Sequence, residues 1–278
     1  MRYPYKIVAD SSANISTLSR VEFASAPLHI LVGDQEFVDV PSTDLTAMQA
    51  ALDAHNGPSS TTCPNPGTWK AAFGDAETIF CVTLTSKLSG TYEAANIAKQ
   101  MYEKEHPGRK VYVYDTLSTG PEMVLLIEKI REMILSGASA EEIDRAACDY
   151  MHHTHLLFSL ASIDNLAKNG RMNRVVAKGI SLLGIRVVGT ANEVGALEML
   201  DKCRGDQRAI TCMIEHMKRR GYTGGRVVIA HNGNQPAAEA LKKQIKKAFG
   251  AVRCDIHPTR GLCSYYAEPQ SLLLGFES

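Results

Sequence analysis

The sequence predicts an α/β protein built from two domains. Its first half alternates strand-like and helix-like segments, a rhythm that is typical of a largely parallel sheet with flanking helices. Its second half carries a strand pair followed by helices and further strands, which indicates an α+β domain with a mixed sheet. A chain of 278 residues is long enough for two packed domains. We therefore expect an N-terminal α/β domain over residues 1–153, a C-terminal α+β domain over residues 154–278 and a cleft between them.

The elements of the first domain follow from its apolar runs and turn signals. A short strand, KIVA, ends in the triplet DSS, and the segment APLHILVGDQEFVDV reads as a hairpin that turns at Gly33-Asp34. Ser42 to Asp44 form a helix start before the amphipathic pattern LTAMQAALDAH. TIFCVTL and KVYVYD are predicted strands that each lead into a helix. The helix SAEEIDRAACDYMHH closes the domain.

The second domain is predicted from a similar pattern. GIRVVGTANEVGALEML reads as two strands that meet at a turn over residues 192–195. A helix DQRAITCMIEHMKRRG, a strand RVVIAH, a helix PAAEALKKQIKKAFG and a strand VRCDIH follow. Two apolar helical segments, EMVLLIEKIREMIL and RVVAKGISLLGI, are interpreted as core. They could equally line an apolar tunnel, because periodicity does not separate these two roles.

Composition excludes several function classes. Thirty basic residues balance thirty acidic ones, so no net charge recruits nucleic acid or an anionic membrane. No apolar run approaches the roughly 20 residues that span a bilayer, and the first residues, MRYPYKIVADSS, lack the apolar core of a signal peptide. We expect a cytoplasmic protein with no nucleic-acid partner and no integral membrane association.

Neither the cysteines nor the histidines predict a metal site. Seven cysteines are scattered without a C-x-x-C pair, so most are interpreted as reduced core residues. The run HHTH at residues 152–155 lacks the i, i+4 spacing of a helical zinc pair. We expect no metal and no cofactor.

The junction TLTSKLSGTYEAANIAK, residues 83–99, is the first candidate site. An apolar strand ends there in hydroxyl residues and a glycine before a helix begins. A helix N-terminus offers unpaired N–H groups and partial positive charge, Gly90 admits a ligand close to the backbone, and Ser89 and Thr91 add hydroxyl donors. No P-loop or dinucleotide motif is present. A small anion site is one interpretation, and simple capping of the helix by Ser89 is the other.

Two further segments carry candidate binding residues. PSSTTCPNPGTW, residues 58–69, reads as a hydroxyl-rich loop in which prolines restrain Thr61 and Thr62. Cys63 within it is a weak candidate nucleophile that would need an adjacent base. In AKNGRMNR, Arg171 follows a turn and could pair with an anion. An ordinary surface loop and a solvated charge are the alternative interpretations.

The order of these motifs resembles the DegV family over nearly the whole chain. IVADSSANI is similar to the family's D-S-[ST]-A-[DN] opening, and STTCPNPG stands where the family has T-S-Q-P-S-P-G. TSKLSGTYEAANIA is close to S-[SK]-L-S-G-T-Y-x-[SA]-A, the most specific of the matches. NLAKNGRMN and LLGIRVV resemble L-x-K-G-G-R-I and L-L-x-[IV]-K-P-[IV].

The resemblance implies two α/β domains that enclose a long-chain fatty acid such as palmitate, stearate or oleate. It also implies a non-catalytic protein that presents the carboxylate to a separate ATP-binding fatty acid kinase subunit, which forms the acyl phosphate. By position, Thr61 and Ser89 would contact the carboxylate, Gly90 and Thr91 would shape the loop, and Arg171 would lie by the portal.

The C-terminal motif departs from the family pattern H-x-G-x-G-A-x-G. Here YYAEPQS places Tyr266 at the histidine position, with Glu268 and Gln270 in place of glycines. A tyrosine can donate a hydrogen bond to a carboxylate but brings no positive charge near neutral pH.

Two other functions remain open from the residues. One is an acyl hydrolase or transferase that uses Ser89 or Cys63, with His231 at a strand end as its base, although no G-x-S-x-G elbow is present. The other is a carrier of a different small anion.

Overall fold

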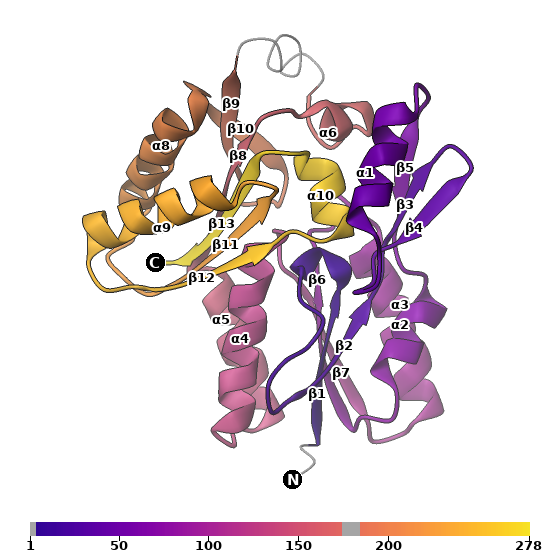
Figure 1. Ribbon diagram of the computed structural model, residues 1–278. Coiled ribbons are helices and arrows are strands. Elements are labelled where there is room, and N and C mark those ends of the chain that lie inside the picture. The colour runs from indigo at the N-terminus through magenta and orange to yellow at the C-terminus, as the bar shows by residue number, and fades with distance from the viewer. Residues whose placement is uncertain (1–3, 174–183) are drawn as a thin grey trace.

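The N-terminal half folds around a four-stranded parallel sheet (Figure 1). The computed structural model describes residues 4–173 and 184–278. The strand order is β2-β1-β6-β7, and every neighbouring pair is parallel. The strands are β1 (Tyr5–Asp10), β2 (Glu22–Ala26), β6 (Thr78–Thr83) and β7 (Lys110–Asp115). A short 3₁₀ helix, η1 (Ser11–Ala13), follows β1 directly.

Helices cover both faces of this sheet because its strands carry apolar residues on both sides. Ile7 packs with one set of helices and the next residue, Val8, with the other. One face is covered by α2 (Pro66–Phe73) and α3 (Thr91–Glu105), and the other by α4 (Pro121–Leu135) and α5 (Ala140–Met151). A parallel sheet buried on both faces was the arrangement that the sequence predicted.

The C-terminal half forms a six-stranded mixed sheet in the order β10-β9-β8-β13-β11-β12. Only the β11–β12 pair is parallel, and the last strand of the chain, β13, lies between β8 and β11. The strands are β8 (Thr154–Leu160), β9 (Ile185–Ala191), β10 (Leu197–Arg204), β11 (Arg226–Asn232), β12 (Arg253–Pro258) and β13 (Ser271–Glu277).

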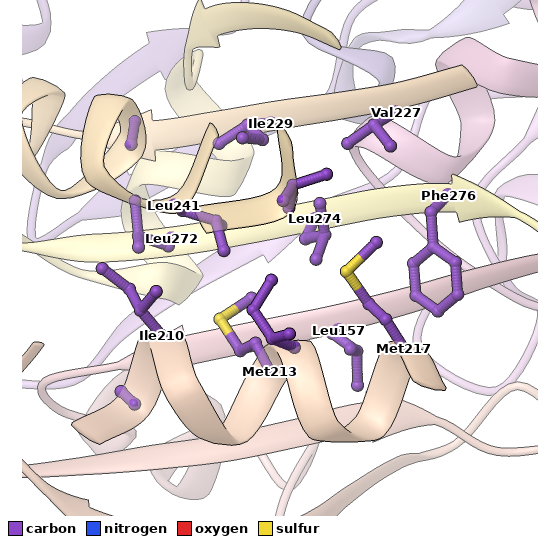
Figure 2. Packing of buried hydrophobic residues seen from close by; sticks show 14 of the residues in the cluster. Leu157, Ile210, Met213, Met217, Val227, Ile229, Leu241, Leu272, Leu274 and Phe276 are labelled. Atoms are coloured by element: carbon purple, nitrogen blue, oxygen red, sulfur yellow. The ribbon is translucent and has the colours of Figure 1, made fainter. Parts of the chain in front are cut away.

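One face of the mixed sheet is covered by α8 (Gly205–Arg219) and α9 (Gln235–Phe249). Figure 2 shows Met213 and Met217 rising from α8 toward strand residues that include Leu274 and Phe276. The opposite face meets α4, whose Val124 and Leu125 pack against Val228 of β11. Because α4 packs on both sheets, it joins the two halves of the chain.

A third, smaller sheet lies beside the junction of the two halves. It contains β3 (His29–Val32), β4 (Gln35–Val38) and β5 (Ser59–Thr62) in the antiparallel order β4-β3-β5. It packs with α1 (Leu45–Ala54) and with α10 (Gly261–Ala267) near the C-terminus. A last short helix, α6 (Asp164–Lys168), contacts α10.

The predicted fold class is confirmed, and so are both predicted strand pairs. The first turns at Gly33-Asp34 and the second over residues 192–195. The helix expected after Ser42 begins at Leu45, where the side chain of Asp44 accepts hydrogen bonds from the first turn. The core helix EMVLLIEKIREMIL corresponds to α4. The other segment interpreted as core or tunnel lining, RVVAKGISLLGI, lies outside the described residues except for its last two positions.

Two interpretations of local structure were wrong. Residues 59–62, expected as a loop, form strand β5, because they pair with β3 over four residues. Tyr266 lies in helix α10. Ser89 does not cap α3, whose N-cap is Gly90 with no side-chain hydrogen bond. Among the described helices, none is both long and apolar enough to cross a membrane.

Candidate functional site

A narrow apolar cavity lies where the two halves and the small sheet meet. Its volume is about 60 Å³, on a measure in which one water needs roughly 10–15 Å³. Leucines from both halves form most of its wall, together with Phe158 of β8 and Cys263 of α10. The leucines are Leu28, Leu84, Leu88, Leu156, Leu160, Leu166, Leu197, Leu262 and Leu273. Leucine-rich walls suit an apolar ligand, and a space of about four to six waters must widen to take up a long hydrocarbon chain.

Four predicted residues line this cavity and form a group that we call the head site: Thr61, Ser89, Arg171 and Tyr266. They come from four separate segments of the chain, so only the fold brings them together. The Oγ1 atom of Thr61 and the hydroxyl of Tyr266 lie 2.8 Å apart in a hydrogen bond. The head site therefore places hydroxyl groups and one cation against a mainly apolar wall, to which Thr119, a residue not predicted from the sequence, adds a further hydroxyl.

Arg171 is held in place at the head site by backbone oxygens. Its Nε atom donates to the carbonyl of Leu88 at 3.1 Å, and its Nη1 atom donates to the carbonyl of Asn169 at 2.7 Å. Its guanidinium carbon lies 5.9 Å from the ring centre of Tyr266, within range of a cation–π contact. These contacts fix a positive charge beside the tyrosine.

Tyr266 stays protonated at neutral pH. Burial raises its pKa, against the lowering effects of its hydrogen bond to Thr61 and of the charge on Arg171. A protonated phenol can donate one hydrogen bond. Tyr266 thus offers a neutral donor to the cavity, with Arg171 as the nearby charge.

The N-terminus of α3 completes the polar end of the cavity. Gly90 caps the helix without a side-chain hydrogen bond, so the first amides of α3 have no capping partner among the described residues. Thr91 is fully buried, and its Oγ1 atom has no hydrogen-bond partner within the same residues. Thr91 does not line the cavity, whereas Ser89 does. A 15-residue helix with uncapped amides is a favourable neighbour for an anion.

Helix α10, which carries Tyr266, is positioned by a carboxylate from the small sheet. Asp39 follows β4 and accepts hydrogen bonds from the backbone N–H groups of Gly261 and Leu262, at 2.8 and 2.9 Å. Burial raises the pKa of Asp39, and these two amides oppose that effect. A Cβ atom at Gly261 would lie 2.8 Å from the carboxylate, so only glycine permits this approach. Asp39 was not predicted as a site residue.

A second tyrosine supports the head site from outside the cavity. The hydroxyl of Tyr265 contacts the Oγ of Ser59 at 2.7 Å, and Asn169 donates to the same hydroxyl at 2.9 Å. Tyr265 is almost fully buried and packs edge-to-face on Tyr266. It therefore ties β5 and the segment after α6 to α10.

Thr62 and Cys63 are not brought to the cavity with Thr61. Side chains alternate along strand β5, so Thr62 is exposed while Thr61 faces the cavity. Cys63 lies beside the Cα of Gly90 and packs on the core of the N-terminal half. Neither residue lines the cavity.

The histidines that were considered from the sequence lie away from the head site. His231 is buried in β11, and its Nδ1 atom accepts from the backbone N–H of Asn234 at 3.3 Å. His155 contacts the hydroxyl of Ser278 at 2.8 Å, and burial lowers its pKa to about 4. Neither lines the cavity, so neither is placed to act on a group held by Ser89.

The two positions where the family pattern has glycine keep a glycine-like backbone. Glu268 and Gln270 have φ angles of +58° and +66°, in the left-handed region that favours glycine. Glu268 is held there by a hydrogen bond that its carboxylate accepts from the backbone N–H of Asn165 at 3.0 Å. The side chain of Gln270 donates to the carbonyl of Gly233 at 3.1 Å. The turn after α10 therefore holds two non-glycine residues in a backbone conformation that favours glycine.

Taken together, the fold and the site define a class: α/β proteins built on a parallel and a mixed sheet, with an apolar cavity that ends in hydroxyl groups beside a helix N-terminus. The family model described as "Uncharacterised protein, DegV family" matches residues 4–278. The chain belongs to the DegV family.

Relatives of known sequence and structure match over nearly their full lengths. A DegV domain-containing protein of Streptococcus pneumoniae is 41% identical over 98% of this chain and 99% of its own. A DegV family protein from Eubacterium eligens, solved with heptadecanoic acid, has a TM-score of 0.97 at 41% identity and covers 99% of each chain.

Two further solved structures are similar. The fatty acid kinase B3 protein of Streptococcus pneumoniae, loaded with linoleic acid, has a TM-score of 0.96 at 40% identity and covers 100% of this chain and 99% of its own. A Thermotoga maritima protein described as revealing fatty acid binding function has a TM-score of 0.85 at 27% identity, over 98% of each chain.

Proposed function

We propose that this protein binds a long-chain fatty acid, such as palmitate, stearate or oleate, with its tail in the apolar cavity and its carboxylate at the head site. The observation that carries the proposal is the joining of a leucine-lined cavity to the Thr61–Tyr266 hydroxyl pair. The relatives solved with heptadecanoic and linoleic acid support the same class of ligand.

The energetics assign different tasks to the two ends of the ligand. Burying about 14 methylenes at roughly 0.8 kcal/mol each yields on the order of 11 kcal/mol before association costs of about 4 kcal/mol or more. A helix N-terminus adds only roughly 0.3–1 kcal/mol toward an exposed anion, and up to about 2 kcal/mol when it is partly buried. The tail therefore sets the affinity, and the head site sets the preference for an acid over an uncharged analogue.

Organic extraction of freshly purified protein followed by mass spectrometry tests the ligand class. We expect about one free fatty acid per chain. The Ser89→Ala variant tests the head site, because the Ser89 hydroxyl lines the cavity beside the start of α3. We expect it to weaken binding of the acid more than binding of the matched alcohol. Equal retention of acid and alcohol by both wild type and variant would contradict the assignment.

We further propose that the bound carboxylate is presented to a separate ATP-binding fatty acid kinase subunit, which phosphorylates it. The name of the similar Streptococcus pneumoniae protein supports this role. Mixing the fatty-acid-loaded protein with such a subunit and ATP should yield an acyl phosphate that hydroxylamine converts to a hydroxamate. If a kinase subunit that is active with its usual fatty-acid-binding protein gives no product here, the result would contradict this step. It would not contradict the proposal that this protein binds a fatty acid.

No observation favours an acyl hydrolase or transferase. His231 was the candidate catalytic base for this function, and it does not line the cavity. The candidate nucleophile Cys63 does not line it either. A carrier of another small anion is less well supported, because the lining of the cavity is mainly leucine.

A further inference from the structure

A cluster of metal-ligating side chains lies in the C-terminal half, on the far side of the mixed sheet from the cavity. Asp201 comes from β10, and Cys212 and His216 come from α8. One ligand atom of each lies within 4.8 Å of the other two. Within residues 4–173 and 184–278, these three side chains form the one group of at least three His, Cys, Asp or Glu residues that is close enough to hold a metal ion. The binding of a fatty acid makes no use of it.

The fold explains why these residues meet. Cys212 and His216 are four positions apart on α8 and share one face of the helix. Each directly precedes a methionine, Met213 or Met217, that points into the core in Figure 2. The neighbouring face of α8 thus points toward β10. The pairing of β10 with β9 shifts register between Met199 and Asp201, as at a β-bulge.

The contacts within the cluster are close. The Nε2 atom of His216 lies 2.6 Å from Oδ2 of Asp201, and the thiol of Cys212 donates to the same oxygen at 3.2 Å. Cys203 stands two residues after Asp201 on β10, so it shares the same face of the strand and lies near Cys212. The fold therefore brings three ligand atoms close together, and a further thiol lies near them outside that group.

We propose that Asp201, Cys212 and His216, with Cys203 as the fourth ligand, form a binding site for Zn²⁺. Carboxylate, imidazole and thiolate are the ligands of tetrahedral zinc sites, in which ligand atoms lie roughly 3.3–3.8 Å apart given bond lengths of about 2.0–2.3 Å. The Nε2 atom of His216 would move away from Oδ2 of Asp201 to reach that spacing, and Cys203 would turn toward the other three ligands. Each thiol loses its proton to solvent as its bond to zinc forms.

The two thiols favour a metal that binds thiolate over calcium or magnesium. Arg208 and Glu215 lie near Cys203, and Arg219 lies near Asp201. With zinc bound to one carboxylate and two thiolates the site would carry a net negative charge, which these arginines offset. Arg220 contacts Nδ1 of His216 at 3.5 Å, and it would turn away when zinc holds Nε2, because Nδ1 then carries the proton.

This site was not predicted from the sequence, because its residues are spread over positions 201 to 216 without a recognised ligand spacing. The expectation of no metal rested on the absence of C-x-x-C pairs and on the spacing of the HHTH run. Asp201 and Cys203 are two positions apart on a strand, and Cys212 and His216 are four positions apart on a helix. Only the folded structure places these two pairs next to each other.

Titration of the reduced, metal-free full-length protein with Co²⁺ and Zn²⁺ tests the proposal. We expect one equivalent to bind with thiolate-to-cobalt charge-transfer absorption, Zn²⁺ to displace the cobalt, and Mg²⁺ and Ca²⁺ to have no effect. Cys212→Ser and His216→Ala should each weaken binding by at least about tenfold. The matched control Cys148→Ser removes an exposed thiol on α5 and should leave binding unchanged.

Asp201→Asn provides a variant that keeps the fold, because the Asp201 side chain is 44% exposed and its replacement is of similar size. It should also weaken binding. The proposal is overturned if no stoichiometric metal binds or if cobalt binds without thiolate absorption. It is likewise overturned if all variants bind like wild type, or if Cys203 and Cys212 are joined as a disulfide in freshly purified protein.

Discussion

Replacing Tyr266 with phenylalanine removes a single hydroxyl from the head site and leaves the wall of the cavity nearly unchanged. That hydroxyl now bonds to Thr61 at 2.8 Å in a partly buried position. A hydrogen bond to a charged partner contributes about 1.5–3 kcal/mol, and a bond between neutral partners about 0.5–1.5 kcal/mol. Because the site is only partly buried, we use the lower end of each range.

The expected result is a change in selectivity rather than a loss of binding. Tyr266→Phe should raise the Kd for palmitate about tenfold and the Kd for the matched C16 alcohol about threefold or less. Most of the binding free energy comes from the tail, so both ligands should remain bound. Calorimetric titration of delipidated protein with each ligand measures the two values.

Tyr265→Phe is the matched control, because it removes the hydroxyl of the adjacent tyrosine, which does not line the cavity. That hydroxyl holds Ser59 and Asn169. Its loss should lower the free energy of unfolding without changing the ratio of acid to alcohol affinity. An equal loss of acid and alcohol binding in Tyr266→Phe would refute the reasoning. So would a selectivity change of the same size in Tyr265→Phe.

Two further predictions concern α4. Glu122 is buried and accepts hydrogen bonds from Ser118 and Thr154, and burial raises its pKa from 4.5 to about 7. The folded state binds the Glu122 proton more tightly than the unfolded state does. The contribution of this proton to the free energy of unfolding is therefore complete below about pH 4.5 and is lost as the pH rises through about 7. Urea unfolding across this range should show wild-type stability falling by up to about 3 kcal/mol more than that of Glu122→Gln; parallel curves would contradict this. Gly275→Ala should lower the free energy of unfolding by about 1–3 kcal/mol, because the new Cβ atom would lie 2.7 Å from the backbone N of Glu122. An unchanged urea midpoint would contradict this and show that α4 can move away.

The sequence carried enough information for the architecture and for part of the head site. Periodic strands and helices predicted the parallel and mixed sheets, because each apolar run belongs to one local element. Thr61, Ser89, Arg171 and Tyr266 were all identified, and they were found to line one cavity. Their roles toward a ligand remain predictions.

Features that depend on distant residues were not predicted. Helix α10 has no capping residue of its own at its start, and its N-terminus is satisfied by Asp39, 222 positions earlier in the chain. Thr62 was grouped with Thr61 because a loop was expected, whereas the alternation of strand β5 turns the two side chains in opposite directions. In each case tertiary pairing, rather than local pattern, decides where the side chain points.

The central position of β13 has a consequence for synthesis on the ribosome. Strands β8 and β11 flank a gap that only residues Ser271–Glu277 fill. Until those residues leave the exit tunnel, both strands present unpaired backbone groups, which invite association between nascent chains. Loss of this strand through premature termination would leave the same two edges open. The seven residues of β13 thus complete the pairing of both neighbouring strands, and a chain truncated before them should be prone to association through these two edges.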